Sequence, residues 1–263
     1  MDWTSSELKG YARKEMKRSL GHYIGVSFVL FLTSMVIFLP FWVALDLETG
    51  GGLAIFNVIL WAGIIFIDLP LSVGFAACYI RAPHGERNLG NLFIIFGSGK
   101  YWSVVLAMLR LTAVVFLWAL LFIIPGIVKA YQYHMVPYIL SESPGISGKE
   151  AMAISRQMTD GHKSGMLFLD IFSFLGWEIL ASIPLVAGFM LGIRMLSAGN
   201  TAGILLMVLA YLIFFASFVV IGIYYQATYA QLYFKMRAEY FKQPDTLPES
   251  HGGLDPRYQP PGQ

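Results

Sequence analysis

The chain has 263 residues, of which 57% are hydrophobic and only 13% are charged. A soluble domain carries about 25% charged residues, so this composition excludes an ordinary water-soluble fold. The mean hydropathy of +0.63 indicates instead that the bilayer is part of the solvent. The net charge of +2 argues against nucleic-acid binding, and the single cysteine, Cys78, excludes an internal disulfide and a multi-cysteine zinc site.

Hydrophobic runs alternate with short polar segments, which predicts an all-α fold: a polytopic transmembrane helical bundle. Residues 1–20 contain five basic residues and apolar residues at helical spacing, and they predict an amphipathic cytoplasmic helix. Residues 21–242 form the predicted transmembrane domain. The tail, 243–263, is rich in proline, glycine and polar residues and is predicted to be a disordered cytoplasmic segment. The predicted spans are roughly 22–45, 53–80, 102–124, 125–140, 164–191 and 202–225.

The long apolar stretch from Trp102 to Leu140 is interrupted by Pro125 and Gly126. About 39 residues is too long for one ordinary span and just long enough for two. Proline ends the incoming helix and suits the first turn of the next, and glycine lets the backbone turn sharply, so we expect a tight helical hairpin. The second arm would be only about 24 Å long, which leaves open whether it crosses the membrane fully or is re-entrant.

The distribution of basic residues predicts the orientation, because lysine and arginine are enriched on the cytoplasmic side. Residues 1–20, 81–100, 141–163 and the segment after 225 carry five, three, three and four of them, whereas the 46–52 loop carries none. These four segments lie on one side only if the stretch from Trp102 to Leu140 crosses twice. We therefore expect six spans in the cell membrane, with both termini cytoplasmic.

A polar connector follows the fourth predicted span. Ser147 and Glu150 have the spacing of a helix capping box, and Gly161 is suited to ending the helix that follows. Apolar residues recur on one face of this segment, which predicts a short amphipathic helix under the bundle. Two roles are open for it: joining the neighbouring spans, or docking a protein or a lipid headgroup.

A set of residues between the hairpin and the fifth span matches a known family. The set comprises Pro125, Gly126, Ile127, Ala130, Tyr131, Tyr133, Pro137, Tyr138, Ile139, Pro144, Glu150, Ala151, Ser155, Met158, Gly161, Lys163, Phe172, Ser173, Phe174, Leu175, Gly176 and Trp177. With these residues the chain resembles the uncharacterised bacterial membrane proteins called domain of unknown function 975 (DUF975). The last third of the chain matches this pattern poorly. The resemblance implies an integral bacterial membrane protein and supplies no activity.

Six ionisable residues fall within the predicted spans and form a candidate intramembrane polar site: Asp68, Arg110, Lys129, His134, Asp170 and Glu178. A charge at mid-bilayer costs ~2.5–3.5 kcal/mol or more, so such residues normally face the bundle interior and pair. Depths estimated from the helical rise place Arg110 level with Asp170, and Lys129 near Glu178. Asp68 precedes a proline that would free a backbone carbonyl. Either these are ion pairs that fix helix register, or they line a polar pathway.

No nucleotide-binding, metalloprotease or serine-hydrolase motif is present, so we expect a non-enzymatic protein with no cofactor and no metal. Two functions are consistent with the sequence: a scaffold or accessory to membrane partners, and a small-solute or lipid transporter that uses intramembrane carboxylates. Besides the lipid bilayer, the expected partner is a membrane protein or a second copy of the chain. Tyrosines of the last helix suggest a partner-binding face or membrane-surface packing.

Overall fold

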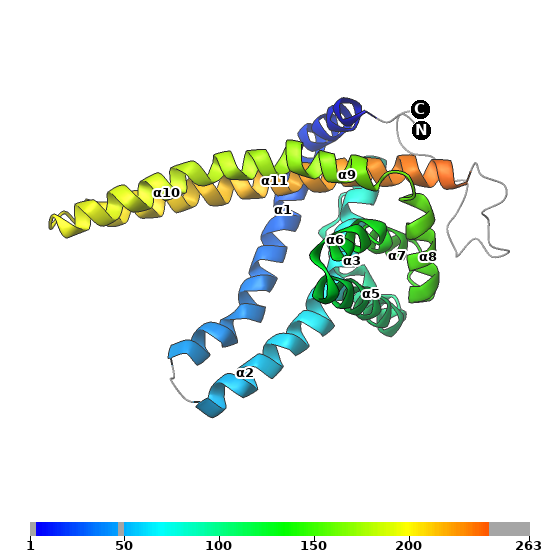
Figure 1. Cartoon of the computed structure of the whole chain (residues 1–263), viewed down its shortest axis with the longest axis horizontal. Coiled ribbons are helices and arrows are strands. Elements are labelled where there is room, and N and C mark those ends of the chain that lie inside the picture. The colour runs from blue at the N-terminus through cyan, green and yellow to red at the C-terminus, as the bar shows by residue number, and fades with distance from the viewer. Residues whose placement is uncertain (1–3, 47–49, 242–263) are drawn as a thin grey trace.

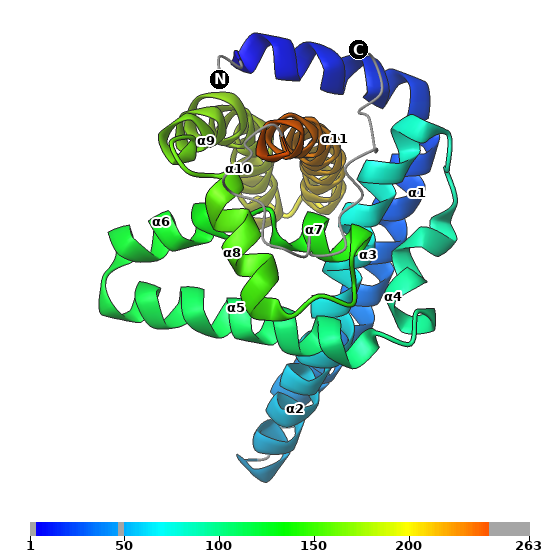
Figure 2. The ribbon, with the colours of Figure 1, turned by 90° about the vertical axis from the view of Figure 1, so that its right-hand side faces the viewer.

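The computed structural model describes residues 4–46 and 50–241, which are helices joined by short turns, with no strand among them. This confirms the predicted all-α fold. The predicted tail from residue 243 lies outside the described residues. The helices form three hairpins that separate from a common hub (Figures 1 and 2). The hairpins pair α1 (Ser5–Asp46) with α2 (Gly50–Gly63), α5 (Tyr101–Leu121) with α6 (Ile123–Gln132), and α10 (Gly176–Ser197) with α11 (Ala202–Tyr240).

The hub is the buried core of the protein. It forms where α3 (Leu69–Arg81), α7 (Val136–Glu142) and α8 (Gly148–Met158) meet the start of α1 and the end of α11. Its largest fully buried side chains include several tyrosines. The remaining elements are π-helical turns at Ile64–Asp68 and Ile171–Leu175, 3-10 turns at Ala82–His84 and Leu89–Phe93, and the short helices α4 (Ile94–Gly97) and α9 (Lys163–Asp170).

Within the described part of the chain, five helical stretches are long and apolar enough to cross a membrane. They are Ser6–Ile37, Asn57–His84, Tyr101–Leu121, Lys163–Ser197 and Ala202–Tyr240. These stretches correspond to five of the six predicted spans. The fourth predicted span, residues 125–140, is divided between α6 and α7, and neither of these two helices is long enough to cross alone. The structure therefore gives this segment a broken path where the sequence suggested a single short helix.

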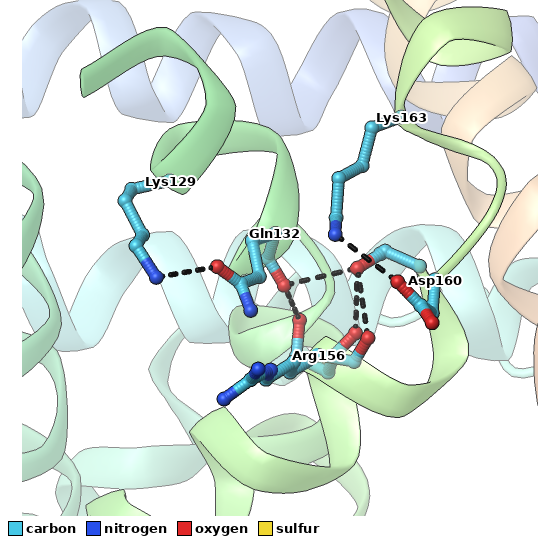
Figure 3. Close-up of polar contacts among 7 residues, drawn as sticks. Lys129, Gln132, Arg156, Asp160 and Lys163 are labelled. Carbon is cyan, nitrogen blue, oxygen red and sulfur yellow. Dashed lines mark hydrogen bonds and ion pairs between the residues drawn. The ribbon is translucent and has the colours of Figure 1, made fainter. Parts of the chain in front are cut away.

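Contacts with the connector explain why α6 ends at Gln132 (Figure 3). The hydroxyls of Ser155 on α8 and of Thr159, the residue that follows α8, donate to the main-chain carbonyl of Gln132 over 2.9 and 3.2 Å. A carbonyl in the last turn of a helix has no intrahelical partner, so these two hydroxyls satisfy it inside the hub. Lys129 donates to the side-chain oxygen of the same glutamine over 2.9 Å. Hence α8 joins α6 to the helices that follow.

The connector helix itself begins where the sequence predicts. The side chain of Ser147 accepts a hydrogen bond from the backbone N–H of Glu150 over 3.2 Å, as a capping residue does. Gly161 follows the helix with a positive φ of 74°. The positions that the sequence placed on one face are buried in the hub: the apolar Ala151, Ile154 and Met158, and the polar Ser155.

The predicted hairpin at Pro125 and Gly126 forms, with Pro125 in the first turn of the second arm as expected, but neither residue makes the turn itself. The chain turns at Phe122, whose backbone is extended (φ −154°, ψ 135°), and Pro125 is the third residue of α6. Gly126 lies inside α6, where an added Cβ would lie 2.5 Å from the Cα of Ala119 on α5. Gly126 is therefore needed for the close approach of two helices, and the turn itself does not depend on it.

The N-terminal segment is the first part of α1. A non-helical backbone at Ser19 (φ −127°, ψ 21°) breaks the helix at the predicted boundary with the first span. Leu8 is buried in the hub, and Glu7 forms a 2.8 Å ion pair with Lys235 of α11.

The basic segments meet at the hub. The N-terminal segment is held to the end of α11 by the Glu7–Lys235 pair, and His162 of the connector lies 3.8 Å from Glu239 of the same helix. The ring of His84, within the basic segment 81–100, packs against Phe234 of α11 with centroids 6.1 Å apart. All four basic segments thus gather at one end of the structure, as expected if they lie on the same side of a membrane.

Candidate functional site

A cluster of aromatic and ionisable side chains joins α6, α9 and α11. Asp170 is the last residue of α9 and immediately precedes a π-helical turn, a feature that is frequent at functional sites. Its carboxylate accepts hydrogen bonds from the hydroxyls of Tyr131 and Tyr229 over 2.7 and 2.6 Å. One carboxylate therefore ties three helices together, and two short hydrogen bonds replace the solvation that it loses.

His134 extends this cluster towards the hub. It lies in the turn between α6 and α7, outside the five candidate spans, with its ring centroid 4.3 Å from that of Tyr229. The ring of Tyr229 in turn contacts Tyr225 at 4.6 Å. Burial lowers the pKa of His134 to about 4, so the imidazole is neutral at physiological pH. A neutral imidazole can donate and accept one hydrogen bond each, and it contributes no charge to the cluster.

The expected ion pairs within the membrane do not form. Arg110 is exposed on α5 and makes no ion pair among the described residues, while Asp170 binds tyrosines. Lys129 lies over the ring of Trp118 at 5.3 Å and has no ion pair with Glu178. Both expected pairs are wrong for one reason: the helical rise predicts how deep a residue lies and does not predict which way it points around the helix axis.

Asp68 lies at a break in the second span, as the sequence predicts. Pro70 has no N–H, so the carbonyl of Phe66, four residues earlier, loses its helical donor. The hydroxyl of Tyr101 donates to this carbonyl over 2.6 Å, and a π-helical turn ends at Asp68. The carboxylate of Asp68 is exposed and forms no hydrogen bond or ion pair with another described residue.

Two cavities lie on either side of a shared wall made by Phe75 and Gln226. The first has a volume of about 540 Å³ and lies among α3, α5, α6, α7 and α11. The described residues that line it include no aspartate, glutamate, lysine or arginine, and its histidine, His134, is neutral. The second, about 460 Å³, lies between α1 and the α10–α11 hairpin, and Glu178 lines it. The hydroxyl of Tyr138 donates to Gln226 over 3.0 Å and fixes the wall. Both volumes are in the range of small-molecule sites.

A buried ion pair in the hub was missed by sequence reasoning. Arg237 of α11 and Glu142 of α7 lie 3.0 Å apart, and their side chains are only 4% and 15% exposed. The hydroxyl of Tyr233 donates to the same carboxylate over 2.8 Å. Arg237 is near the end of α11, and no pattern of neighbouring residues in the sequence marks it as the partner of Glu142.

The tyrosines of α11 were also misplaced. Tyr229 and Tyr233 are fully buried and face the hub, so they form neither a partner-binding face nor a membrane-surface layer. Their spacing of four residues was the available signal, since it places both on one face of the helix. Trp177, one of the motif residues, is 61% exposed on α10. No group of three or more histidine, cysteine, aspartate or glutamate side chains within the described ranges could hold a metal ion.

We expect Tyr229→Phe to destabilise the protein by about 1.5 kcal/mol, because it removes a hydrogen bond to a charged group. The change keeps the ring contacts with His134 and removes only the hydroxyl that binds Asp170. Thermal unfolding of the purified protein in detergent measures the effect. Tyr211→Phe is the matched control, since Tyr211 is exposed on the same helix and donates no hydrogen bond to the described residues. Equal unfolding temperatures for the two variants would contradict the role of the cluster.

The long apolar helices and the hub that connects them define a multi-pass integral membrane protein. The family model described as "Protein of unknown function (DUF975)" matches residues 123–240. This match covers less than half of the chain, and over the segment from α6 to α11 it confirms the family resemblance that the motif residues indicate. The match also extends through α11, which the motif residues alone did not reach. Among curated proteins and among solved structures, none matches the chain.

Proposed function

We propose that this protein is a non-enzymatic scaffold or accessory component that binds other integral membrane proteins in the bacterial inner membrane. The observation that carries the proposal is the apolar end of the α5–α6 hairpin. Residues 120–124, here called the hairpin tip, are all apolar and between 66% and 75% exposed. They project away from the hub (Figure 2). A tip that emerged into water would be expected to carry polar loop residues, so its chemistry suits lipid or the helices of another protein.

The proposed orientation places the hub and both termini in the cytoplasm. The four basic segments gather around the hub, and lysine and arginine favour the cytoplasmic face. The hairpins then enter the bilayer from that side. Because α6 is only 10 residues long, the α5–α6 hairpin returns to the hub after a shorter path than the other two, which favours a re-entrant segment.

A scaffold needs surfaces that bind other proteins and does not need chemically reactive groups. The partly buried carboxylates of this protein support such a role, because they join helices. Asp170 is held by two tyrosine hydroxyls and Glu142 by Arg237. Both carboxylates are thereby held in fixed positions that join helices. No motif of an enzyme class accompanies them in the sequence.

Site-specific photo-crosslinking in native membranes tests the proposal. A photoreactive residue replaces Ile123 in the hairpin tip, which is 75% exposed, and in a control protein it replaces Ile193 of α10, which is 58% exposed. We expect a discrete protein adduct from position 123, either with one partner or with a second copy of the chain, and lipid adducts from position 193. Lipid adducts alone at both positions, or the same protein adducts at both, would contradict the scaffold.

The second candidate is a small-solute or lipid transporter. It is favoured by the two cavities that share Phe75 and Gln226, because a change in these two side chains would join one cavity to the other. The exposed carboxylates of Asp68 and Glu178 are the residues that coupling to a proton or cation would use. A transporter would insert normally and lose transport when these carboxylates are neutralised, whereas a scaffold would keep its crosslinks.

A further inference from the structure

The cavity between α1 and the α10–α11 hairpin has an unusual combination of linings. Its volume is about 460 Å³, and most of its lining side chains are apolar. Its polar side chains are few: two serines of α1, the amide of Gln226, the hydroxyl of Tyr225 and one carboxylate. It lies between helices that are long and apolar enough to cross the membrane. A molecule held here must therefore have a large apolar surface.

Among the described residues, Glu178 is the one charged residue that lines this cavity, and none of those that line it is basic. Glu178 forms no ion pair or hydrogen bond with another described residue. It also lines an adjoining cavity of about 280 Å³, so its carboxylate is accessible from both. A carboxylate in an apolar setting is poorly solvated, so a neighbouring cation stabilises its charged form more than it would in water.

Aromatic rings form much of the remaining wall. Phe31 of α1 and Phe215 of α11 meet edge to face with centroids 4.9 Å apart, and Phe75, Phe218 and Tyr225 also line the space. The faces of such rings attract cations, and sets of rings around a binding site recognise quaternary ammonium groups. The rings and the carboxylate therefore favour the same sign of charge on a ligand, while the apolar lining excludes a small hydrated ion.

We propose that this cavity is a binding site for a lipophilic cation: a quaternary ammonium, phosphonium or protonated amine with bulky apolar substituents. The positive centre lies near Glu178 and its substituents contact the rings of Phe31, Phe75 and Phe215. This site goes beyond the scaffold proposal and does not depend on it, since it uses different helices from the hairpin tip. A failure of one proposal leaves the other intact.

Calorimetric titration of the purified full-length protein in a mild detergent with tetraphenylphosphonium tests the site. We expect saturable binding, with a Kd at least about tenfold weaker in Glu178→Gln, which removes the charge and keeps the shape. Glu178→Asp keeps the charge and retains binding. Asp68→Asn is the matched control, because it neutralises another exposed carboxylate within a span. Asp68 does not line the cavity, so we expect this variant to bind tetraphenylphosphonium as the unmodified protein does.

Titration with tetraphenylborate, which has the same shape and the opposite charge, separates recognition of charge from partition into apolar space. We expect no saturable binding of this anion. Equal binding of both ions, or an unchanged Kd in Glu178→Gln, overturns the proposal. If Glu178→Gln does not remain folded, Phe215→Leu supplies the test: loss of one ring should weaken phosphonium binding by about two- to fivefold. Unchanged binding in that variant also overturns the site.

Discussion

Replacing Glu142 by leucine is expected to destabilise the protein by about 3–5 kcal/mol, because it removes the carboxylate that pairs with a buried arginine. Arg237 is only 4% exposed and lies 3.0 Å from Glu142, so its guanidinium would keep its charge inside the hub without this carboxylate. The substitution also removes the acceptor of the Tyr233 hydroxyl. Thermal unfolding of the purified protein and its yield from membranes measure the loss.

The chain contains its own control for this prediction. Glu7 pairs with Lys235 over 2.8 Å, a shorter distance than in the hub pair, but these side chains are 44% and 27% exposed. Exposed pairs contribute roughly 0–1 kcal/mol, so Glu7→Leu should change the unfolding temperature little. If both variants lose the same stability, burial does not determine the free-energy cost of breaking an ion pair. The hub would then be more hydrated than its packing indicates.

The sequence predicted those features of the fold that depend on neighbouring residues. The lengths of apolar runs predicted six spans, five of which correspond to long apolar helical stretches in the described part of the chain, and Ser147 with Glu150 predicted the start of α8. Pro70 predicted a freed carbonyl, which the structure locates at Phe66. In each case the physical cause lies in one continuous stretch of sequence. It is a missing N–H, a capping hydroxyl, or a run of apolar residues long enough to cross the hydrocarbon core.

Partners from distant parts of the chain could not be predicted in this way. Asp170 pairs with Tyr229, which is 59 residues away. The choice between that hydroxyl and Arg110 depends on how α5, α9 and α11 are rotated about their axes. The division of residues 125–140 has a similar origin. The hydroxyls that end α6 come from Ser155 and Thr159, 23 and 27 residues after Gln132, and nothing in the local sequence marks them as its partners.

The arrangement of the hairpins was also beyond the sequence. Hydropathy identifies which residues avoid water and does not specify whether an apolar side chain faces lipid or another helix. The three hairpins converge at the hub and separate towards their loops, which leaves many apolar side chains of the predicted bundle exposed (Figure 1). Tyrosines and charged side chains concentrate at the hub, so the polar contacts that fix the helices lie at one end.

Replacing Gly126 by valine is expected to separate α6 from α5 and to destabilise the hairpin. A Cβ at this position would lie 2.5 Å from the Cα and 2.7 Å from the Cβ of Ala119. Overpacking of this kind costs about 1–3 kcal/mol and occasionally more. Here the upper end is expected, because a backbone Cα cannot rotate away as the end of a flexible side chain can. Thermal unfolding and the rate of proteolysis in detergent measure the change.

Gly176→Val is the matched control, since Gly176 is also helical and an added Cβ there has no atom within 4 Å. Both variants replace glycine by the same β-branched residue in a helix, so their intrinsic helix propensities change equally. Any additional loss in Gly126→Val therefore measures the contact with α5. The double variant with Ala119→Gly should recover part of that loss, because it removes the Cβ from the contact but leaves the Cα. If the two glycine variants are equally stable, the hairpin does not require this close approach, and Gly126 lies in the family motif for another reason.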